Sequence, residues 1–579
     1  MMPDILEGPK DTWLRHYTSN RVGETEVNQI ISALKNDGLV QDEKGMLRWR
    51  DFPDKPSVLY KQNRPKNKST GKKDGSGVVD TNTSGTATTH VQQPAGQGGN
   101  ERKIFRPLGN IINAIAKVPL PNLSPSCEYK EEPYSTESEV SGSQHRIDGY
   151  LGLIKFTSPP APKGSRVATS DVAVNFGKSE NKPHLICDNR WKMLYSAFHN
   201  LHSDCQRKHT YSMTIEDNHV SLWYFSRSHS AKSHDFDLLD VRAVTHALSA
   251  LIFSTVEDLG YDANIRRVVE RDEETKQDWI RYVYRLQNRF FKTLKCRGEY
   301  DDLYIAGRAT RVWEVVEVAS FDNTVALPNA RPMILRDVWL DHGSNTEREI
   351  QEKIFERCDE IARKFPPKDD PRLFGVDDAT RELLHQRLKD GSYKRLFLTI
   401  KADYRGVTSK DRAEGFTPAP DASGELVYIN QEAKTPRSDA QRASTSGTPG
   451  AHGPDASMPS MQQASAPREY KAKQRNFVVY EEVCSALHEL DDLHDVVQAL
   501  LDAVLGEVAL HSPPVDYTDT LHGPALQILF LISWIHRDVS SGNILSYNGR
   551  GILGDLEYAK EFNLSVGACS QSPKTVRLS

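Results

Sequence analysis

Polar side chains near the end of the sequence follow one another in an order that suits phosphate transfer. His536, Arg537 and Asp538 are consecutive, Asn543 follows Asp538 by five positions, and Asp555 follows it by 17. Phosphoryl transfer uses a carboxylate to orient the attacking hydroxyl and accept its proton, and it uses oxygen ligands on Mg²⁺, which neutralises charge on the phosphates. Asp538 suits the first task, and Asn543 and Asp555 suit the second. The pattern predicts a phosphotransfer site.

A β-hairpin would bring the two candidate metal ligands together. The segment 544–553 reads ILSYNGRGIL, and its Asn548-Gly549 pair is a strong signal for a two-residue turn between strands. Pairing of the flanking apolar residues returns the chain to its starting point and places Asp555 near Asn543. Any one of these elements alone is compatible with an ordinary turn or strand end, but their combination at these offsets is not expected by chance.

This segment resembles the fungal-type protein kinase domain family of the protein-kinase-like superfamily. The resemblance rests on "WIHRDVSSGNIL" and "GDLEYAK", and on the upstream stretches "YSMTIEDNHVSLWYFSRS", "AGRATRVWEV", "ILRDVWLD" and "FVVYEEV" in the same order. It covers roughly residues 185 to 565. It implies a two-lobed kinase fold, ATP and Mg²⁺ as cofactors, and a protein Ser or Thr hydroxyl as acceptor.

The resemblance also implies roles for the residues of the catalytic segment. By position, Asp538 is the catalytic base, His536 belongs to the same loop, and Arg537 meets the activation segment. Asn543 and Asp555 hold the metal. The tripeptide "DLE" stands where D-F-G is usual.

The nucleotide side of the site is predicted from two upstream stretches. In "YIAGRATRVWEVVEV", Gly307 would lie in the hairpin that covers the phosphates, and Ala309 stands where a second glycine is usual. A Cβ there limits how closely backbone N–H groups approach phosphate. An exposed β-hairpin is the alternative for this stretch. Arg336 stands where the family carries its ATP-binding lysine; an arginine can contact phosphate through two N–H groups, with a geometry unlike that of lysine.

A helix after that strand would supply the acidic partner of Arg336. The apolar spacing of "EREIQEKIFERC" predicts this helix. Glu347 shares the apolar face with Ile350 and is our choice for the partner. Glu349 and Glu352 are alternatives, and a solvated acidic helix face is the alternative without a role in binding.

The hinge of the nucleotide site is predicted in "NFVVYEEVCSAL". Its alternating apolar residues indicate a buried strand, after which Glu482, Val483 and Cys484 would place backbone groups against adenine. The spacing in "DLHDVVQALLDAVL" then predicts a core helix that leads toward the catalytic loop.

The predicted fold class is α+β: a protein-kinase-like two-lobed fold with a truncated C-terminal lobe, an N-terminal extension and disordered linkers. Truncation is expected because no A-P-E element and no large helices follow Asp555. Residues 505–533 resemble nothing in the family, which suggests an insertion or a retained intron. The predicted parts are an N-terminal segment with a short helix (1–60), a disordered linker (61–103), an α+β extension (104–290), the kinase N-lobe (291–484) with a disordered insertion (408–468), and the start of the C-lobe (485–579).

Composition narrows the class of protein. The sequence has 74 Lys and Arg against 79 Asp and Glu, a net charge of −5, which gives no general reason to expect binding to nucleic acid or membrane. Its 7 cysteines form no CxxC pair, so neither a zinc site nor a disulfide framework is indicated. The longest apolar stretch, "ALQILFLISWI", is too short to cross a bilayer, and no secretory signal is present. A cytoplasmic or nuclear location is expected, and the oligomeric state is not predicted.

Three functions remain open from the sequence. The first is a protein kinase acting on Ser or Thr hydroxyls. The second is a pseudokinase or regulatory module that binds nucleotide without transferring phosphate, which Arg336, Ala309 and the truncated lobe favour. The third is a small-molecule kinase, because Ser540 stands where Ser/Thr kinases usually carry lysine; Arg537 and the upstream resemblance argue against it.

Overall fold

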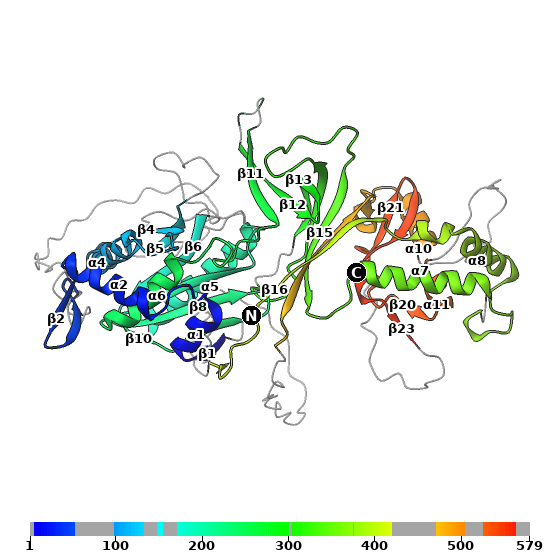
Figure 1. Ribbon diagram of the computed structural model, residues 1–579. Coiled ribbons are helices and arrows are strands. Elements are labelled where there is room, and N and C mark those ends of the chain that lie inside the picture. The colour runs from blue at the N-terminus through cyan, green and yellow to red at the C-terminus, as the bar shows by residue number, and fades with distance from the viewer. Residues whose placement is uncertain are drawn as a thin grey trace, which may run out of the picture. The chain divides into compact units, whose positions relative to one another are not determined.

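The computed structural model divides the chain into two compact units, each of which contains helices and sheets (Figure 1). Unit 1 comprises the described residues of 1–262, 303–306 and 410–470, and unit 2 those of 263–302, 307–409 and 471–579. This mixture of helices and sheets is compatible with the predicted α+β class. The structure describes residues 5–52, 98–131, 147–154, 171–271, 274, 276, 278–299, 304–373, 376–419, 470–503 and 525–562.

Unit 1 is built around a mixed sheet with the strand order β17-β1-β9-β8-β7-β6-β5-β4, in which β10 also pairs with β8. The pairs β1–β9 and β6–β7 are parallel. Strands β7 and β8 form a hairpin, with Asp217 in the left-handed region at its turn. The strands are β1 (Ile5–Gly8), β4 (Cys127–Lys130), β5 (Gly149–Leu153), β6 (Val172–Ser179), β7 (His209–Glu216), β8 (His219–Ser226), β9 (Ser230–Ser233), β10 (Phe236–Asp237) and β17 (Thr417–Pro418).

Helices cover both faces of this sheet. A single apolar core joins one face to α1 (Lys10–Tyr17), α2 (Glu24–Asn36), α4 (Gly98–Lys117) and α6 (Val241–Ile252). On the other face α5 (Pro183–Ser203) approaches so closely that a Cβ added at Gly177 would meet Asn189. A small hairpin, β2 (Val40–Glu43) and β3 (Met46–Trp49), completes the unit.

Two segments predicted to be disordered overlap with ordered elements of unit 1. Residues 98–103 of the predicted linker form the start of α4, and the linker's other residues lie outside the described part. In the predicted insertion, residues 408–419 are described and the remaining ones are not. Phe416 is fully buried against Tyr17, and β17 pairs with β1. The prediction of disorder was wrong for residues 408–419, because the Phe416 side chain packs into a core formed by residues remote in sequence.

Unit 2 contains an antiparallel sheet with the order β11-β12-β13-β14-β15-β18-β16. The predicted boundary at residues 290 and 291 lies inside β13, because two earlier strands extend the same sheet. A capping box at Thr346 and Glu349 begins α7 (Glu347–Arg363), the predicted helix after β15. The strands are β11 (Ile265–Arg271), β12 (Asp278–Leu286), β13 (Arg289–Glu299), β14 (Arg311–Val318), β15 (Met333–Asp341), β16 (Ile400–Thr408) and β18 (Lys473–Tyr480).

A second apolar core in unit 2 lies beneath the catalytic segment. It joins α7, α8 (Asp378–Asp390) and α11 (Ala525–Leu531) to Trp534, Leu553 and Leu556. Figure 1 shows these helices grouped beside β20 and β23. The other elements are α10 (Leu493–Ala503), β19 (Ser485–Ala486), β20 (Trp534–Ile535), β21 (Ile544–Tyr547), β22 (Arg550–Leu553), β23 (Lys560–Glu561) and the 3-10 turns Pro371–Leu373, Ser392–Leu396, Leu487–Glu489 and Leu556–Tyr558.

The position of α11 corrects part of the prediction for residues 505–533. Ala525, Ile528 and Leu529 are buried in the core of unit 2, so 525–533 is an integral part of the fold rather than a foreign insertion. Residues 505–524 lie outside the described part of the chain. The helix packs in the same apolar core as Trp534, the first residue of the catalytic segment.

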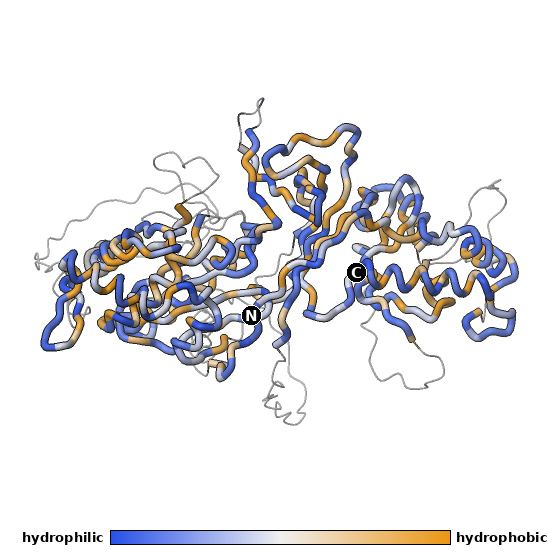
Figure 2. The backbone as a smooth tube through the Cα atoms, viewed as in Figure 1, coloured by the Kyte–Doolittle hydropathy of each residue, from blue (hydrophilic) through white to orange (hydrophobic). Residues whose placement is uncertain are grey.

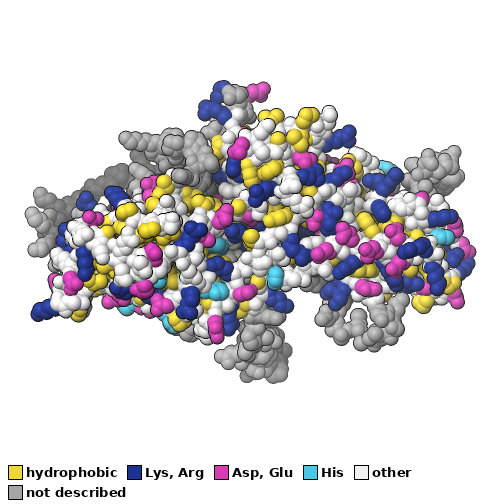
Figure 3. Space-filling view, viewed as in Figure 1, with side chains coloured by type: hydrophobic (Ala, Val, Ile, Leu, Met, Phe, Trp, Pro, Cys, Tyr) yellow, Lys and Arg dark blue, Asp and Glu magenta, His cyan; other side chains and the backbone are white. Residues whose placement is uncertain are grey.

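Hydrophobic and hydrophilic residues alternate along the strands and helices of both units, as expected for elements with one buried face (Figure 2). On the face shown in Figure 3, basic and acidic side chains are interspersed, in keeping with the small net charge. Within the described ranges, each helix is too short or too polar to cross a membrane.

Candidate functional site

The hairpin predicted from Asn548-Gly549 is present. Ile544 to Tyr547 pair with Arg550 to Leu553, and both turn residues have positive φ, at +52° and +71°, as a type I′ turn requires. One further bond, from the Gly554 N–H to the Asn543 carbonyl at 2.9 Å, extends the ladder. Asn543 and Asp555 therefore lie at the open end of the hairpin and line the same cavity.

The hairpin is supported from one side by α10. The Gly551 N–H donates to Asp502 Oδ2 at 2.7 Å, and a Cβ at Gly551 would lie 2.6 Å from the Ala499 carbonyl oxygen. Ala499 and Asp502 are therefore the residues of the helix that meet the hairpin at Gly551. The prediction of an apolar core helix was wrong at its start, since Leu493 is 74% exposed and Val497 is 41% exposed.

His536 connects the catalytic loop to the residue before Asp555. Its Nε2 donates to the Gly554 carbonyl at 2.9 Å, and its Nδ1 accepts from the Asp538 N–H at 3.4 Å. Burial lowers the pKa of this histidine, and the two bonds require the neutral form with the proton on Nε2. Arg537 is exposed and has a φ of +70°. His536 thus holds the backbone at Asp538, just after the turn at Arg537, and the backbone at Gly554, just before Asp555.

Asp538 and Asn543 are joined directly. The Asn543 Nδ2 donates to the Asp538 carbonyl at 2.8 Å and to its Oδ2 at 3.3 Å. Both N–H groups of the amide therefore face Asp538, and Oδ1 remains as the acceptor atom of Asn543. Asp538 is half-buried and lies next to the cavity-lining residue Asn543.

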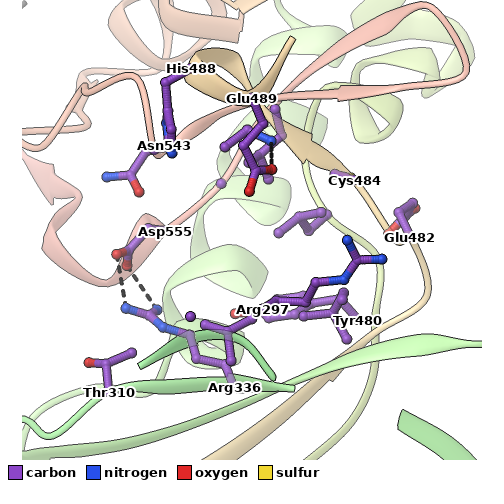
Figure 4. Close-up of a pocket in the computed structure, with 18 residues that line it drawn as sticks. Arg297, Thr310, Arg336, Tyr480, Glu482, Cys484, His488, Glu489, Asn543 and Asp555 are labelled. Carbon is purple, nitrogen blue, oxygen red and sulfur yellow. Dashed lines mark hydrogen bonds and ion pairs between the residues drawn. The ribbon is translucent and has the colours of Figure 1, made fainter. Parts of the chain in front are cut away.

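A cavity of about 440 Å³ lies within unit 2 between the sheet and this hairpin. Its volume is within the range of small-molecule sites. Strands β13 to β15, the end of β18, residues 482–489 and the hairpin line it. Figure 4 shows charged and polar side chains converging on it from these elements. Five residues predicted from the sequence line it: Arg336, Glu482, Cys484, Asn543 and Asp555.

The other predicted residues lie outside the cavity lining. Gly307 is in the loop before β14, with a φ of +135°. The cavity wall on this side is formed instead by Arg297, Gly298 and Thr310. Gly298 was missed, although a glycine inside a strand is a signal for a bulge or a close approach, and the register of β13 does shift beside it. Ala309 has a φ of +44°, a conformation that an alanine rarely adopts.

Arg336 forms a dense set of ion pairs with three carboxylates. Its Nη1 and Nη2 donate to the two oxygens of Asp555, each at 2.9 Å. Nη1 also donates to Glu347 at 3.2 Å, and Nη2 also donates to Glu557 at 2.9 Å. These four bonds use all four N–H groups of the two terminal nitrogens, and only Nε–H remains. The predicted bidentate phosphate contact is therefore unavailable in this arrangement. We call these four residues the Arg336 cluster.

The cluster is buried, and its charges depend on one another. The side chains are 4 to 19% exposed. Burial lowers the pKa of Arg336, but Asp555, Tyr480 and Glu347 outweigh this effect and the pKa is raised above its ordinary value. Burial also raises the pKa of Glu347, and the Arg336 charge opposes this effect. The Tyr480 hydroxyl donates to Glu347 Oε2.

Sequence reasoning missed two further members of this network. Glu557, the last residue of "DLE", pairs with Arg308 as well as with Arg336. Arg308 also donates to the Tyr558 hydroxyl. The signal for Glu557 was its place two residues after Asp555, where the family pattern carries glycine. Of the two alternatives to Glu347, Glu349 caps the start of α7 and pairs with Arg405.

The residues expected to hold magnesium do not fit a divalent cation in this arrangement. Asn543 offers Oδ1, but both oxygens of Asp555 accept from the Arg336 guanidinium, which is itself a cation. Within the described ranges, no group of three or more His, Cys, Asp or Glu residues is placed to hold a metal.

The predicted hinge connects β18 to β19 along the cavity. The Glu482 carboxylate accepts from the Thr399 N–H at 2.9 Å and from the Thr399 hydroxyl at 2.7 Å. This contact holds residues 481–484 against the start of β16. Burial raises the pKa of Cys484 to about 12, so its thiol is neutral. At this end of the cavity the hinge therefore contributes a carboxylate that is hydrogen-bonded to Thr399 and a neutral thiol.

Comparison with known families gives the ancestry of the chain. A model of the fungal protein kinase family matches residues 157–515, which is more than half of the 579 residues. The matched part includes the sheet of unit 2, Arg336 and α7, and it ends before the catalytic segment. No curated protein matches the chain. The match confirms the family resemblance read from the sequence: the chain belongs to the fungal protein kinase family.

Proposed function

We propose that the chain is a protein-kinase-like phosphotransferase that moves the γ-phosphate of ATP to a Ser or Thr hydroxyl of a protein. Membership of the fungal protein kinase family supports kinase chemistry in general. The observation that carries the proposal for this chain is that Asn543 and Asp555 line one end of a cavity of nucleotide size and that Asp538 is hydrogen-bonded to Asn543.

The sheet of unit 2 would serve as the nucleotide lobe of a two-lobed kinase fold, and the catalytic segment would belong to the second lobe. ATP would place its base at the end of the cavity lined by Glu482 and Cys484 and its phosphates toward Asn543. Figure 4 shows these two groups at separate places around the cavity. Magnesium is the metal that the family implies, and it would supply charge neutralisation on the phosphates.

Asp538 is the proposed base for the acceptor hydroxyl. The bond from Asn543 fixes its carboxylate, and the neutral His536 fixes its backbone. Such a carboxylate accepts a proton as the hydroxyl oxygen attacks phosphorus, and its main contribution is orientation of the nucleophile.

A second candidate is a pseudokinase or regulatory module that binds nucleotide without transferring phosphate. The Arg336 cluster favours it, because both oxygens of Asp555 are engaged by a guanidinium. Because the terminal N–H groups of Arg336 donate to carboxylates, they also cannot bind phosphate as the ammonium group of a lysine would.

The test uses the full chain. ATP binding is measured by titration calorimetry, and transfer is measured with γ-labelled ATP and a mixed protein acceptor such as casein. Asp538→Asn should reduce transfer by about 10²-fold or more while it preserves ATP binding. The matched control is Asp491→Asn, which changes an exposed carboxylate outside the site and should transfer phosphate like the wild type.

The outcomes separate the two candidates. Transfer that Asp538→Asn abolishes and Asp491→Asn preserves supports the phosphotransferase. Tight ATP binding with no transfer above background supports the second candidate. Equal transfer by wild type and Asp538→Asn would exclude Asp538 as the base.

A further inference from the structure

In the Arg336 cluster, the Arg336 guanidinium is bound to the Asp555 carboxylate, which by family resemblance would hold a metal ion. The Nη1 and Nη2 of the guanidinium donate to Oδ1 and Oδ2 of Asp555, each at 2.9 Å. Such a fork-to-fork pair is the strongest geometry available to an arginine and a carboxylate. Arg336 is 12% exposed and Asp555 is 19% exposed, so water screens the pair weakly.

Two further carboxylates, those of Glu347 and Glu557, also hold the Arg336 guanidinium in this position. Glu347 is fixed by the Tyr480 hydroxyl and by the Leu556 N–H, and Glu557 is fixed by Arg308. Each of these carboxylates accepts from Arg336. A small rotation of the guanidinium toward the cavity would therefore break bonds to three acids together.

A divalent cation on Asp555 would have to approach the same two oxygens. It would meet a positive guanidinium at hydrogen-bond distance, and like charges in a weakly screened site repel strongly. The only other oxygen ligand that the predicted metal pair offers is Asn543 Oδ1, which is neutral. The metal and Arg336 are thus alternatives at Asp555, not partners.

We propose that Arg336 competes with Mg²⁺ for Asp555, and that nucleotide enters the cavity of this chain without a divalent ion on that carboxylate. The proposal rests on the proposed function in one respect, namely that the cavity binds ATP. It adds that residue 336 sets the dependence of nucleotide binding on magnesium. Phosphate transfer would then require that the Arg336–Asp555 pair opens.

Lysine at position 336 provides a sharp comparison. A lysine keeps the positive charge, but its ammonium is a single point with three N–H groups and cannot form the planar pair with both oxygens of Asp555. It would still reach one or two of the carboxylates. Arg336→Lys should therefore leave an oxygen of Asp555 available to a metal without leaving the acids unpaired.

The experiment measures ATP affinity by titration calorimetry in excess EDTA and in millimolar MgCl₂, on the full chain. The wild type should change its ATP affinity by less than about threefold between the two buffers, and Arg336→Lys should gain at least about tenfold with MgCl₂. Arg405→Lys is the matched control, because it makes the same exchange at an exposed arginine of unit 2 that pairs with Glu349 and does not line the cavity. It should keep the weak magnesium response of the wild type.

Three results would overturn the proposal. A wild-type affinity that rises tenfold or more with MgCl₂ contradicts it while leaving the proposed ATP site intact. An equally weak response in Arg336→Lys shows that Arg336 is not the cause. Absence of ATP binding by the wild type in both buffers contradicts the proposed function itself. If Arg336→Lys does not fold, as judged by circular dichroism, the wild-type response alone decides.

Discussion

Arg336 and Asp555, which are 219 positions apart in the sequence, face each other through two N–H···O bonds of equal length. The first lies on β15, an interior strand, and the second follows the β21–β22 hairpin, so the pair ties the sheet of unit 2 to the catalytic segment. Glu347 and Glu557 accept from the same guanidinium. Position 336 therefore contributes to the stability of this unit as well as to the chemistry of its cavity.

Removal of the guanidinium should destabilise unit 2. Arg336→Met leaves three buried acids without their cation, and loss of one partner of a buried ion pair typically costs about 3–5 kcal/mol. Denaturant unfolding of the full chain measures the change. The double variant Arg336→Met with Asp555→Asn should recover part of it, with a coupling of about 1 kcal/mol or more. Additive effects of the two substitutions would contradict the pairing.

Close packing of α10 on the hairpin predicts that Gly551 tolerates no side chain. A Cβ there would lie 2.6 Å from both the Ala499 carbonyl oxygen and the Asp502 Cβ. Gly551→Ala should lower the free energy of unfolding by about 1–3 kcal/mol, because helix and hairpin must separate. Gly542→Ala is the control: its nearest neighbour would be Ser540 Oγ at an ordinary 3.8 Å, and its stability should stay within about 0.5 kcal/mol of the wild type.

Phe416 should anchor the segment 410–419 in unit 1. Its ring is fully buried and packs edge-on against Tyr17 at 5.8 Å between centroids. Phe416→Ala should cost about 3–5 kcal/mol, the usual range for loss of a buried phenyl ring. Limited proteolysis should cut this segment faster in the variant. Thr417→Ala changes an exposed neighbour and should leave both the stability and the cleavage rate nearly unchanged.

Acidification should loosen the catalytic segment through His536. Burial lowers the pKa of this histidine below the 6.5 of an unperturbed imidazole, so the unfolded state binds a proton that the folded state does not. Stability is therefore retained above about pH 6.5 and falls as the pH drops toward the lowered pKa, by at most about 1.4 kcal/mol per pH unit. Hydrogen exchange of peptides covering 534–560 measures the loss. The variant His536→Asn has no imidazole to titrate at this position. If hydrogen exchange of these peptides depends on pH in the variant as it does in the wild type, His536 is not the cause of the loosening.

Much of the local structure could be predicted from the sequence. The hairpin around Asn548-Gly549 follows from turn residues that require positive φ, and α7 follows from an apolar spacing behind a capping threonine. Contacts between near neighbours in the chain decide these elements. For the same reason the offset from Asn543 to Asp555 was sufficient to place both on one cavity.

Other features depended on residues remote in sequence. The expectation of disorder failed at Phe416 because the residues that bury it are about 400 positions earlier. The end of the segment read as an insertion is required because α11 completes a core with α7 and α8. Composition cannot anticipate such contacts, since one or two apolar side chains are enough to fix a segment when a core is already present.

The sequence by itself determined the family, the residue types of the site and the hairpin that joins Asn543 to Asp555. The tertiary structure added two further partners of Arg336, Asp555 and Glu557. The sequence named Glu347 as the acidic partner of Arg336, and the structure places the two at 3.2 Å, but the sequence did not place Asp555 or Glu557 beside the guanidinium. In the folded chain three carboxylates, from α7 and from the residues after β22, accept hydrogen bonds from its guanidinium at the wall of the cavity. An ion pair forms with whichever charged group the fold brings within hydrogen-bond distance. That distance depends on how segments remote in sequence pack together, which local sequence patterns do not specify.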